Sequence, residues 1–366
     1  MSKKNIIFVT NHFQSSDGTT RVLLNLVNNL DLEKYNITIK PLYKLERSLL
    51  KEVKSGIIVK KFFGFYFKGL NRIVSLIPKK LLYKMIVDKK YDIEIAFQRE
   101  MPTFIVANST NSEAIHICWM HGYEFYEKEY SMVDKVVCVS RYCRDKARGE
   151  AVNPTIKNKI LTLYNLNNDK MIINASKDEV DISINSDCIN LITVGRLSNE
   201  KGFIRLVKIL ARLRDENFNF KLYIIGDGPE RQQIEDTIKN LNMYNYVFLL
   251  GKQENPHKYT SKVDLFVCSS YTEGYSTACT EAAILNIPIL TTDVPGANEI
   301  INDCECGIVV DNNDDALYSG LKNILNNPAI IMKWKDILKT TSYKFSLENR
   351  KVEITNFFND LDEKNS

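Results

Sequence analysis

The feature that most constrains the fold is a pattern that occurs twice along the chain: short apolar stretches, each followed by a polar or glycine-containing loop and often by a helical segment. The first series begins at residues 5–10, and its loop contains Asp17 and Gly18 before the helical stretch 21–30. Further strand-like runs lie at 37–40, 93–97, 115–119, 135–139 and 160–164. Buried apolar runs alternating with helices are typical of parallel sheets. The first half is therefore predicted to be a doubly wound α/β domain.

The same pattern restarts at residue 189 and predicts a second α/β domain. Its strand-like runs lie at 189–194, 221–225, 246–250, 265–268 and 288–291, with helical segments at 203–214 and 231–241. From about residue 167 to 187 the sequence is polar and acidic, which is typical of a linker. A chain of 366 residues is also too long for one ordinary core. We predict domains at 1–165 and 188–345, a linker at 166–187, and a C-terminal helix over 346–366 that packs back toward the first domain.

Charge is distributed unevenly between the two halves. Residues 1–165 carry 27 Lys and Arg against 16 Asp and Glu, whereas residues 166–366 carry 22 against 29. A basic first half indicates an anionic partner, either a membrane lipid or a phosphate-bearing acceptor, and does not by itself identify nucleic acid. The alternative is an ordinary solvated surface rich in lysine.

Cysteine usage and hydropathy bear on the compartment. The eight cysteines lack paired spacing, which favours reduced thiols in the cytosol. The first apolar run is too short for a signal peptide, and no run approaches the roughly 20 apolar residues of a spanning helix. We therefore expect a cytoplasmic protein that is neither secreted nor membrane-spanning.

Two motifs of the second domain carry groups suited to a phosphorylated ligand. GRLSNEKG follows a strand, and its Arg196 and Lys201 can offset the charge of a diphosphate. In EGYSTACTEA, a helix that starts near Ser276 would offer backbone N–H groups to phosphate. Glu273 would lie before that helix and Glu281 inside it, where carboxylates can accept hydrogen bonds from sugar and ribose hydroxyls, respectively.

GRLSNEKG, GDGPE and EGYSTACTEA, in this order and spacing, resemble retaining glycosyltransferases of family 4, and the resemblance covers nearly the whole chain. It implies the GT-B fold, in which two Rossmann-like domains face a cleft. It also implies that Arg196 and Lys201 bind the donor phosphates. Glu281 would bind the ribose, and Glu273 would position the donor sugar without covalent modification. The motif residues Tyr275, Ser276 and Thr277 are assigned to the donor site as well.

The resemblance extends to the first domain with one departure. Gly18 and Thr19 match the family's glycine-rich loop, which approaches the donor phosphate or the acceptor across the cleft, so Gly18 is assigned to donor binding. The usual pair of adjacent glycines is replaced here by Asp17 and Gly18. His121, in CWMHGYEF, matches a histidine that many members point at the donor sugar. The alternative for His121 is a structural histidine, and the sequence does not decide its pKa.

Two further expectations concern the base and the metal. GKQENPHKYTSKVDLFVCSS resembles the segment that packs against the nucleobase, so Lys252 and Gln253 are assigned to base contacts; the alternative is ordinary loop chemistry. No Asp-x-Asp triplet lies near the site motifs, and the cations with the helix start replace a divalent ion. The chain should need no cofactor and no metal, because the nucleotide sugar is a substrate, and activity should survive a chelator.

Residues 60–90 form a basic and aromatic stretch. This stretch contains nine Lys or Arg but a single acidic residue, Asp88, and five aromatic residues lie within 62–67. Basic residues around an apolar face are how a helix lies on an anionic membrane surface. We expect peripheral membrane attachment here; the alternative is that the aromatic side chains belong to the core.

The function predicted from these observations is a retaining hexosyl transfer (EC 2.4) in polysaccharide or glycoconjugate synthesis. The donor would be a nucleotide sugar, UDP being the commonest base among similar enzymes, and the acceptor a glycan or lipid-linked glycan rather than a nucleic acid. A non-catalytic nucleotide-sugar-binding scaffold and a nucleotide-sugar epimerase on the same fold remain alternatives. A dehydrogenase is a weaker alternative, because no G-x-G-x-x-G motif follows the first strand.

Overall fold

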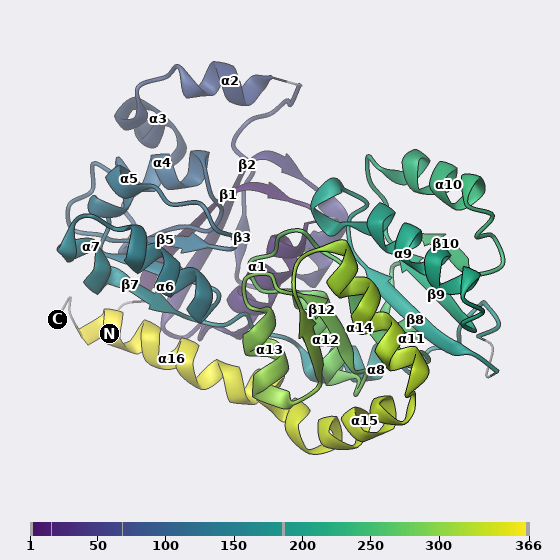
Figure 1. Ribbon diagram of the computed structural model, residues 1–366. Coiled ribbons are helices and arrows are strands. Elements are labelled where there is room, and N and C mark those ends of the chain that lie inside the picture. Colours follow the sequence, from purple (N-terminus) through teal and green to yellow (C-terminus); the bar gives the residue numbers. More distant parts are fainter. Residues whose placement is uncertain (1–2, 16, 68, 185–186, 364–366) are drawn as a thin grey trace. The chain divides into compact units, whose positions relative to one another are not determined.

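The computed structural model describes residues 3–15, 17–67, 69–184 and 187–363. Two compact units divide the chain. The first comprises residues 1–166 with 351–366, and the second comprises residues 167–350. Each unit is built on one parallel β-sheet (Figure 1). Within the described ranges, no helix is both long and apolar enough to cross a membrane.

The sheet of the first unit has seven parallel strands in the order β3-β2-β1-β4-β5-β6-β7. Residues Ile6 to Val9 in β1 are fully buried, because the central strand is covered on both faces. The order reverses direction between β1 and β4, and loops leaving adjacent strands there diverge. The strands are β1 (Lys4–Phe13), β2 (Tyr35–Leu45), β3 (Ile58–Val59), β4 (Ile93–Ala96), β5 (Ile115–Met120), β6 (Lys135–Cys138) and β7 (Ile160–Thr162).

The sheet of the second unit has six parallel strands in the order β10-β9-β8-β11-β12-β13. Counted within this unit, the order is third, second, first, fourth, fifth and sixth, as in dinucleotide-binding folds. The reversal lies between β8 and β11. The strands are β8 (Ile189–Val194), β9 (Phe220–Ile225), β10 (Val247–Gly251), β11 (Leu265–Cys268), β12 (Ile289–Thr292) and β13 (Gly307–Val310).

Helices connect the strands in both units. Those of the first are α1 (Gly18–Asn29), α2 (Leu70–Ser75), α3 (Lys79–Ile86), α4 (Met101–Ala107), α5 (Glu127–Ser131), α6 (Arg141–Glu150) and α7 (Pro154–Lys159). Those of the second are α8 (Asp169–Ala175), α9 (Phe203–Asp215), α10 (Arg231–Asn240), α11 (His257–Thr260), α12 (Thr277–Ile284), α13 (Ala297–Cys304), α14 (Asp314–Asn326) and α15 (Ala329–Thr341). Short 3₁₀ turns occupy Arg47–Glu52, Asn199–Lys201 and Ser342–Phe345.

The last helix, α16 (Leu347–Glu363), begins in the second unit and ends in the first. In the first unit, Lys4 Nζ lies 2.9 Å from a carboxylate oxygen of Asp362, and the Tyr35 hydroxyl donates to the same carboxylate at 2.6 Å. The residues after Lys351 are therefore fixed to the first sheet. Residues 364–366 of the predicted C-terminal segment lie outside the described part.

The segment 166–187, which the sequence analysis assigns to a linker, contains α8. Residues 185 and 186 of that segment are outside the described part. Two short strands were missed by the sequence analysis, β3 and β13. Helix α1 begins three residues before the predicted helical stretch, because the Asp17 side chain accepts a hydrogen bond from the Thr19 N–H and caps the helix earlier.

Candidate active site

The loops after β8 and β11 leave adjacent strands at the reversal point of the second sheet. The first loop carries GRLSNEKG and the second precedes α12 and carries Glu273. Ligands of open α/β sheets bind at this place, outside the carboxyl ends of the strands. The sheet order therefore brings these two predicted motifs together.

Lys201 and Glu273 form an ion pair at this edge. The Lys201 Nζ donates to Glu273 Oε1 at 2.6 Å, and the Ser270 hydroxyl donates to the same oxygen at 2.7 Å. The two charged side chains are 25% and 12% exposed. Burial disfavours the charged form of Lys201, but the adjacent Glu273 carboxylate raises its pKa above the ordinary value. Lys201 therefore keeps its positive charge at neutral pH, and two donors fix the carboxylate.

Glycines allow the backbones of these loops to come into close contact. Gly202 has a φ of 66°, and a Cβ there would lie 2.2 Å from the Ser269 carbonyl oxygen. Gly226 has a φ of 147°, and its Cβ would lie 1.8 Å from the carbonyl oxygen of Gly195. Both conformations and both approaches require glycine. The motif glycines therefore set the spacing of the loops that hold the ion pair.

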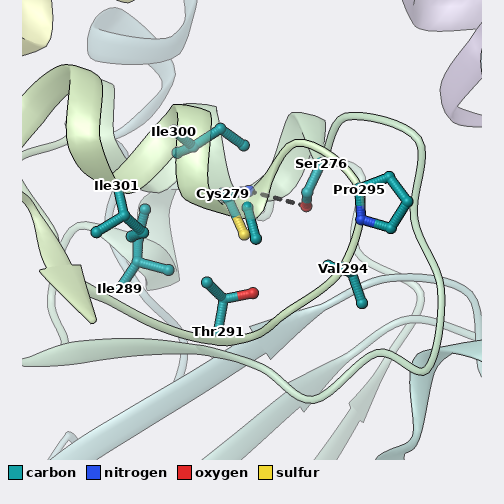
Figure 2. Close-up of a pocket in the computed structure, with 9 residues that line it drawn as sticks. Ser276, Cys279, Ile289, Thr291, Val294, Pro295, Ile300 and Ile301 are labelled. Atoms are coloured by element: carbon teal, nitrogen blue, oxygen red, sulfur yellow. Dashed lines mark hydrogen bonds between the residues drawn. The ribbon is translucent and has the colours of Figure 1, made fainter. Parts of the chain in front are cut away.

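Helix α12 begins where the sequence predicts. Ser276 is its N-cap, and its hydroxyl oxygen accepts from the Cys279 N–H at 3.3 Å. Figure 2 shows this bond beside a small pocket whose walls are mostly aliphatic and come from β12, α12, α13 and the loop with Pro295. Apolar packing behind the cap fixes the helix start, whose first N–H groups lack helical partners and favour an anion.

Glu281 lies in the second turn of α12, as predicted. Its side chain is 22% exposed, and its Oε2 lies 3.9 Å from His257 Nδ1 at the start of α11. His257 lies in the segment GKQENPHKYTSKVDLFVCSS, which is predicted to contact the base, but this residue was not itself predicted. Tyr275 is buried and packs against Gly296, where a Cβ would lie 2.8 Å from the Tyr275 ring. Thr277 is the first residue of α12.

The remaining donor-site predictions concern Arg196, Lys252 and Gln253. Arg196 is exposed at the end of β8. Lys252 is exposed after β10, an edge strand that β9 separates from β8. The Gln253 amide donates to the Leu250 carbonyl at 2.8 Å, and its oxygen accepts from the Tyr259 hydroxyl at 3.2 Å. The Gln253 side chain is thus part of the turn itself, and contacts to a base stay a prediction.

Arg205 is a residue of this edge that the sequence analysis missed. Its side chain is 3% exposed and donates to the carbonyls of Ser269 and Ser270, both at 2.8 Å. The guanidinium also lies 3.9 Å from the ring centre of Tyr271. Arg205 thereby ties α9 to the loop that carries Glu273. The sequence contains one signal for a buried charge: Arg205 occupies an otherwise apolar position of the helical segment 203–214.

His121 lies in the first unit, directly after β5. Its ring centre is 4.5 Å from that of Phe97. Burial lowers the pKa of His121 to about 3, although a hydrogen bond to the backbone of Phe97 acts in the opposite direction. Its Nε2 is buried and has no hydrogen-bond partner among the described residues. His121 is therefore neutral at neutral pH, with one ring nitrogen able to bind a hydroxyl.

Gly18 is the first residue of α1, at the reversal point of the first sheet. The Asp17 carboxylate accepts from the Thr19 N–H at 3.0 Å and from the Gln98 amide at 2.7 Å. Gln98 also accepts from the Asn11 N–H at 2.6 Å. A carboxylate therefore occupies the start of α1, which disfavours an anionic ligand there. A role of Gly18 in donor binding stays a prediction.

The described part of the chain contains no set of side chains arranged to bind a metal ion. No group of three or more His, Cys, Asp or Glu side chains is placed there to hold an ion. The independence from metal stays a prediction that a chelator tests.

Two Rossmann-like parallel sheets in one chain are the architecture of GT-B glycosyltransferases, and solved structures of that class match the chain over nearly its whole length. In sequence, the second unit is similar to the group 1 glycosyltransferases, family 4. The family "Glycosyl transferases group 1" matches residues 175–341.

Relatives resemble the chain in sequence, and solved structures resemble it in fold. An uncharacterized glycosyltransferase of Methanocaldococcus jannaschii is 28% identical over 259 residues, which cover 70% of this chain but only 61% of that protein. The lipopolysaccharide core biosynthesis glycosyltransferase LpsD of Rhizobium meliloti is 24% identical, covering 87% of this chain and 88% of LpsD. Anabaena HepE, crystallised with UDP and glucose, matches with a TM-score of 0.75 at 13% identity over 97% of this chain and 99% of HepE.

Proposed function

We propose that the protein transfers a hexosyl group from a nucleotide sugar to a glycan or lipid-linked glycan, with retention of anomeric configuration, in the synthesis of a cell-surface polysaccharide or glycoconjugate. The observation that carries this proposal is the Lys201–Glu273 pair at the reversal point of the second sheet. It combines a fixed cation, suited to phosphate, with a fixed carboxylate, suited to sugar hydroxyls.

The diphosphate would be bound by cations and backbone N–H groups. Lys201 is held in place by Glu273, Arg196 is exposed at the end of β8, and α12 begins at Thr277. When the bond between sugar and diphosphate breaks, negative charge develops on the leaving phosphate oxygen. Fixed positive charges near that oxygen stabilise the transition state more than the ground state, which accelerates the reaction.

Glu273 would orient the sugar rather than attack it. Its Oε1 accepts hydrogen bonds from both Lys201 and Ser270, which reduces its nucleophilicity and leaves Oε2 for a sugar hydroxyl. In this front-side reaction the acceptor hydroxyl attacks from the face that the diphosphate leaves. Glu281 would bind the ribose hydroxyls. The neutral His121 would bind a hydroxyl of the donor sugar.

The comparisons favour a UDP-sugar and an envelope glycan. HepE was crystallised with UDP and glucose, and LpsD acts in lipopolysaccharide core biosynthesis. The eight cysteines are in the reduced form, which is compatible with a cytoplasmic location where nucleotide sugars are available.

The first experiment is a thermal-shift screen of the full chain against UDP, GDP, ADP and their sugar conjugates. A ligand that binds the folded state raises the melting temperature. We expect one base to stabilise the wild type and Lys208→Ala, an exposed lysine on α9, but not Lys201→Ala. No shift with any nucleotide at millimolar concentration would remove the proposed donor site.

Transfer itself distinguishes the enzyme from a binding scaffold. The nucleotide sugar selected by the screen, labelled in the sugar, is incubated with the protein and a bacterial lipid extract, with and without EDTA. We expect label in the lipid fraction under both conditions, and an α linkage from an α-linked donor by NMR. Binding without transfer would favour the scaffold, and recovery of an epimerised donor would favour the epimerase.

A further inference from the structure

Glu100, the last residue before α4, has a backbone conformation that residues other than glycine rarely adopt. Its φ is 65° and its ψ is −117°. Four other described residues besides glycine have a positive φ: three asparagines, which tolerate it, and Glu305. Glu305, with a φ of 49° and a ψ of 37°, lies in the left-handed helical region. The ψ of Glu100 lies outside that region, so its backbone is strained and a glycine would relieve the strain.

The turn that contains Glu100 is held from both sides. The Gln98 side-chain oxygen accepts from the Asn11 N–H at 2.6 Å, and the Arg99 carbonyl accepts from the Asn11 side chain at 3.0 Å. On the other side, the Glu100 carbonyl accepts from the Phe104 N–H at 3.0 Å. Strain of this kind persists only where the neighbours determine the backbone, and it is common at functional sites.

The Glu100 side chain is exposed at the carboxyl end of β4, the strand beside β1 at the reversal point of the first sheet. No described residue forms an ion pair or a side-chain hydrogen bond with its carboxylate, which does not cap α4 either. The preceding Arg99 pairs with Glu124 instead. The strained turn therefore presents an unpaired carboxylate at the edge where ligands of open α/β sheets bind.

Two polar groups near Glu100 also lack partners. Tyr43, at 3% exposure, has a buried hydroxyl without a hydrogen-bond partner among the described residues, and the same holds for His12 Nδ1. The ring centres of these two residues are 5.8 Å apart. Burial, followed by the negative charge of the nearby Glu100, raises the pKa of Tyr43 to about 12. Buried polar groups are almost always paired, so two unpaired ones beside an unpaired carboxylate point to a ligand of this edge.

We infer that Glu100 binds the acceptor, by accepting a hydrogen bond from a hydroxyl of its sugar ring. The inference rests on the proposed function, which assigns the diphosphate to the second unit and leaves the acceptor without a binding residue. A carboxylate accepts strongly from a hydroxyl, and the fixed backbone limits the entropy lost on binding. Because an unpaired carboxylate repels phosphate and carboxylate groups, the ring bound here is a neutral sugar.

The alternative is that Glu100 only favours the start of α4, where a negative charge is stabilising. In that case its charge affects folding and neither substrate. Two variants separate these roles. Glu100→Gln keeps the strained backbone and removes the charge, whereas Glu100→Gly removes both the strain and the side chain.

The test measures transfer of the labelled sugar to a bacterial lipid extract, while the amounts of extract and of nucleotide sugar are varied separately. We expect the amount of extract that gives half-maximal transfer to rise about tenfold in Glu100→Gln, and further in Glu100→Gly. The half-saturating concentration of the nucleotide sugar should not change in either variant.

Thermal unfolding provides a second readout. Relief of the strain should raise the melting temperature of Glu100→Gly by about 2–4 °C, although this variant binds the acceptor more weakly. Glu305→Gly and Glu305→Gln are the matched controls, because Glu305 is an exposed glutamate with a positive φ in the second unit. Neither control should change the dependence of transfer on the extract or on the nucleotide sugar.

The outcomes distinguish the inference from the proposed function. Wild-type dependence on the extract in both Glu100 variants would overturn the inference alone, as would an equal change in the Glu305 variants. A parallel rise in the half-saturating concentration of the nucleotide sugar would place Glu100 at the donor and also contradict it. Absence of transfer by the wild type would refute the proposed function, and the inference with it.

Discussion

At the carboxyl edge of the second sheet a lysine and a glutamate form an ion pair, whereas the same edge of the first sheet carries a neutral histidine and an amide network. Lys201 is charged because Glu273 offsets the cost of burial. His121 is buried beside Phe97 without an acidic partner, so it loses its proton. Gln98 joins the loops of the first sheet through neutral and charge-assisted hydrogen bonds.

In both units the strand order determines where a site can lie, and the loops determine its chemistry. Both sheets reverse direction beside their first strand. The loops of the second offer positive charge and suit a diphosphate, while the helix start of the first is taken by Asp17. The start of α1 therefore disfavours an anionic ligand.

Lys201→Ala should have the largest effect. In the proposed function Lys201 is a fixed cation at the leaving phosphate, so its removal should lower kcat/KM about 10²–10³-fold. The rate of nucleoside diphosphate release from the selected donor measures it. Lys208→Ala on α9 should keep the wild-type rate, and a near-wild-type rate for Lys201→Ala would assign the phosphate to other groups.

Arg205→Met should destabilise the fold by about 2–4 kcal/mol, because it removes the charged donor from the buried Ser269 carbonyl and leaves the Ser270 carbonyl with the Thr292 hydroxyl alone. Denaturant unfolding measures the change. Arg212→Met is matched, since Arg212 lies on the same helix and stacks on Tyr318 at 4.1 Å but is half exposed. Its effect should stay within about 0.5 kcal/mol. Similar losses in both variants would refute the positioning role of Arg205, as would an unchanged donor KM in Arg205→Met.

The buried His121 should make the protein sensitive to mild acid. The unfolded chain binds a proton at this residue below its ordinary pKa of 6.5, whereas the folded chain does so only near pH 3. Stability should therefore be full above pH 6.5 and fall by up to about 2 kcal/mol at pH 5. His121→Asn should remove this part of the pH dependence of the unfolding free energy. An unchanged pH profile would show that the histidine is solvated.

Asp17→Gly should have the smallest effect on donor binding. It restores the adjacent glycines of the family pattern and removes the cap of α1, at a cost of a few tenths of a kcal/mol, together with the hydrogen bond from the Gln98 amide, at about 1.5–3 kcal/mol. Donor affinity, measured by calorimetry, should not change, because the account assigns the diphosphate to the second sheet. An affinity gain of several-fold would instead place a donor phosphate at the start of α1.

The sequence predicts the strands of both sheets well because they are apolar runs bounded by polar loops. β8 and β11 begin and end at the predicted residues, while β3, only two residues long, lacks a pattern to detect. The start of α12 follows from one N-cap, Ser276. These features depend on local sequence.

The missed features depend on contacts between distant segments. Arg205 acts on carbonyls 64 and 65 residues away, so its sequence neighbours give no indication of its partners. The pKa of His121 follows from burial against Phe97, which the sequence leaves undecided. Residues 60–90 divide between core and surface: Leu82 and Tyr83 are buried, whereas Phe65 and Leu76 are exposed. Composition alone does not distinguish these two groups.

The most direct test of the account is calorimetric binding of the selected nucleoside diphosphate and of its nucleoside to the full chain. If the second sheet holds the donor by its diphosphate, the diphosphate should bind at least about 100-fold more tightly, since charge-assisted hydrogen bonds contribute about 1.5–3 kcal/mol each. Lys201→Ala should reduce this ratio about tenfold or more and leave nucleoside binding unchanged. Equal affinities of the two ligands, or a ratio that Lys201→Ala does not alter, would contradict the account.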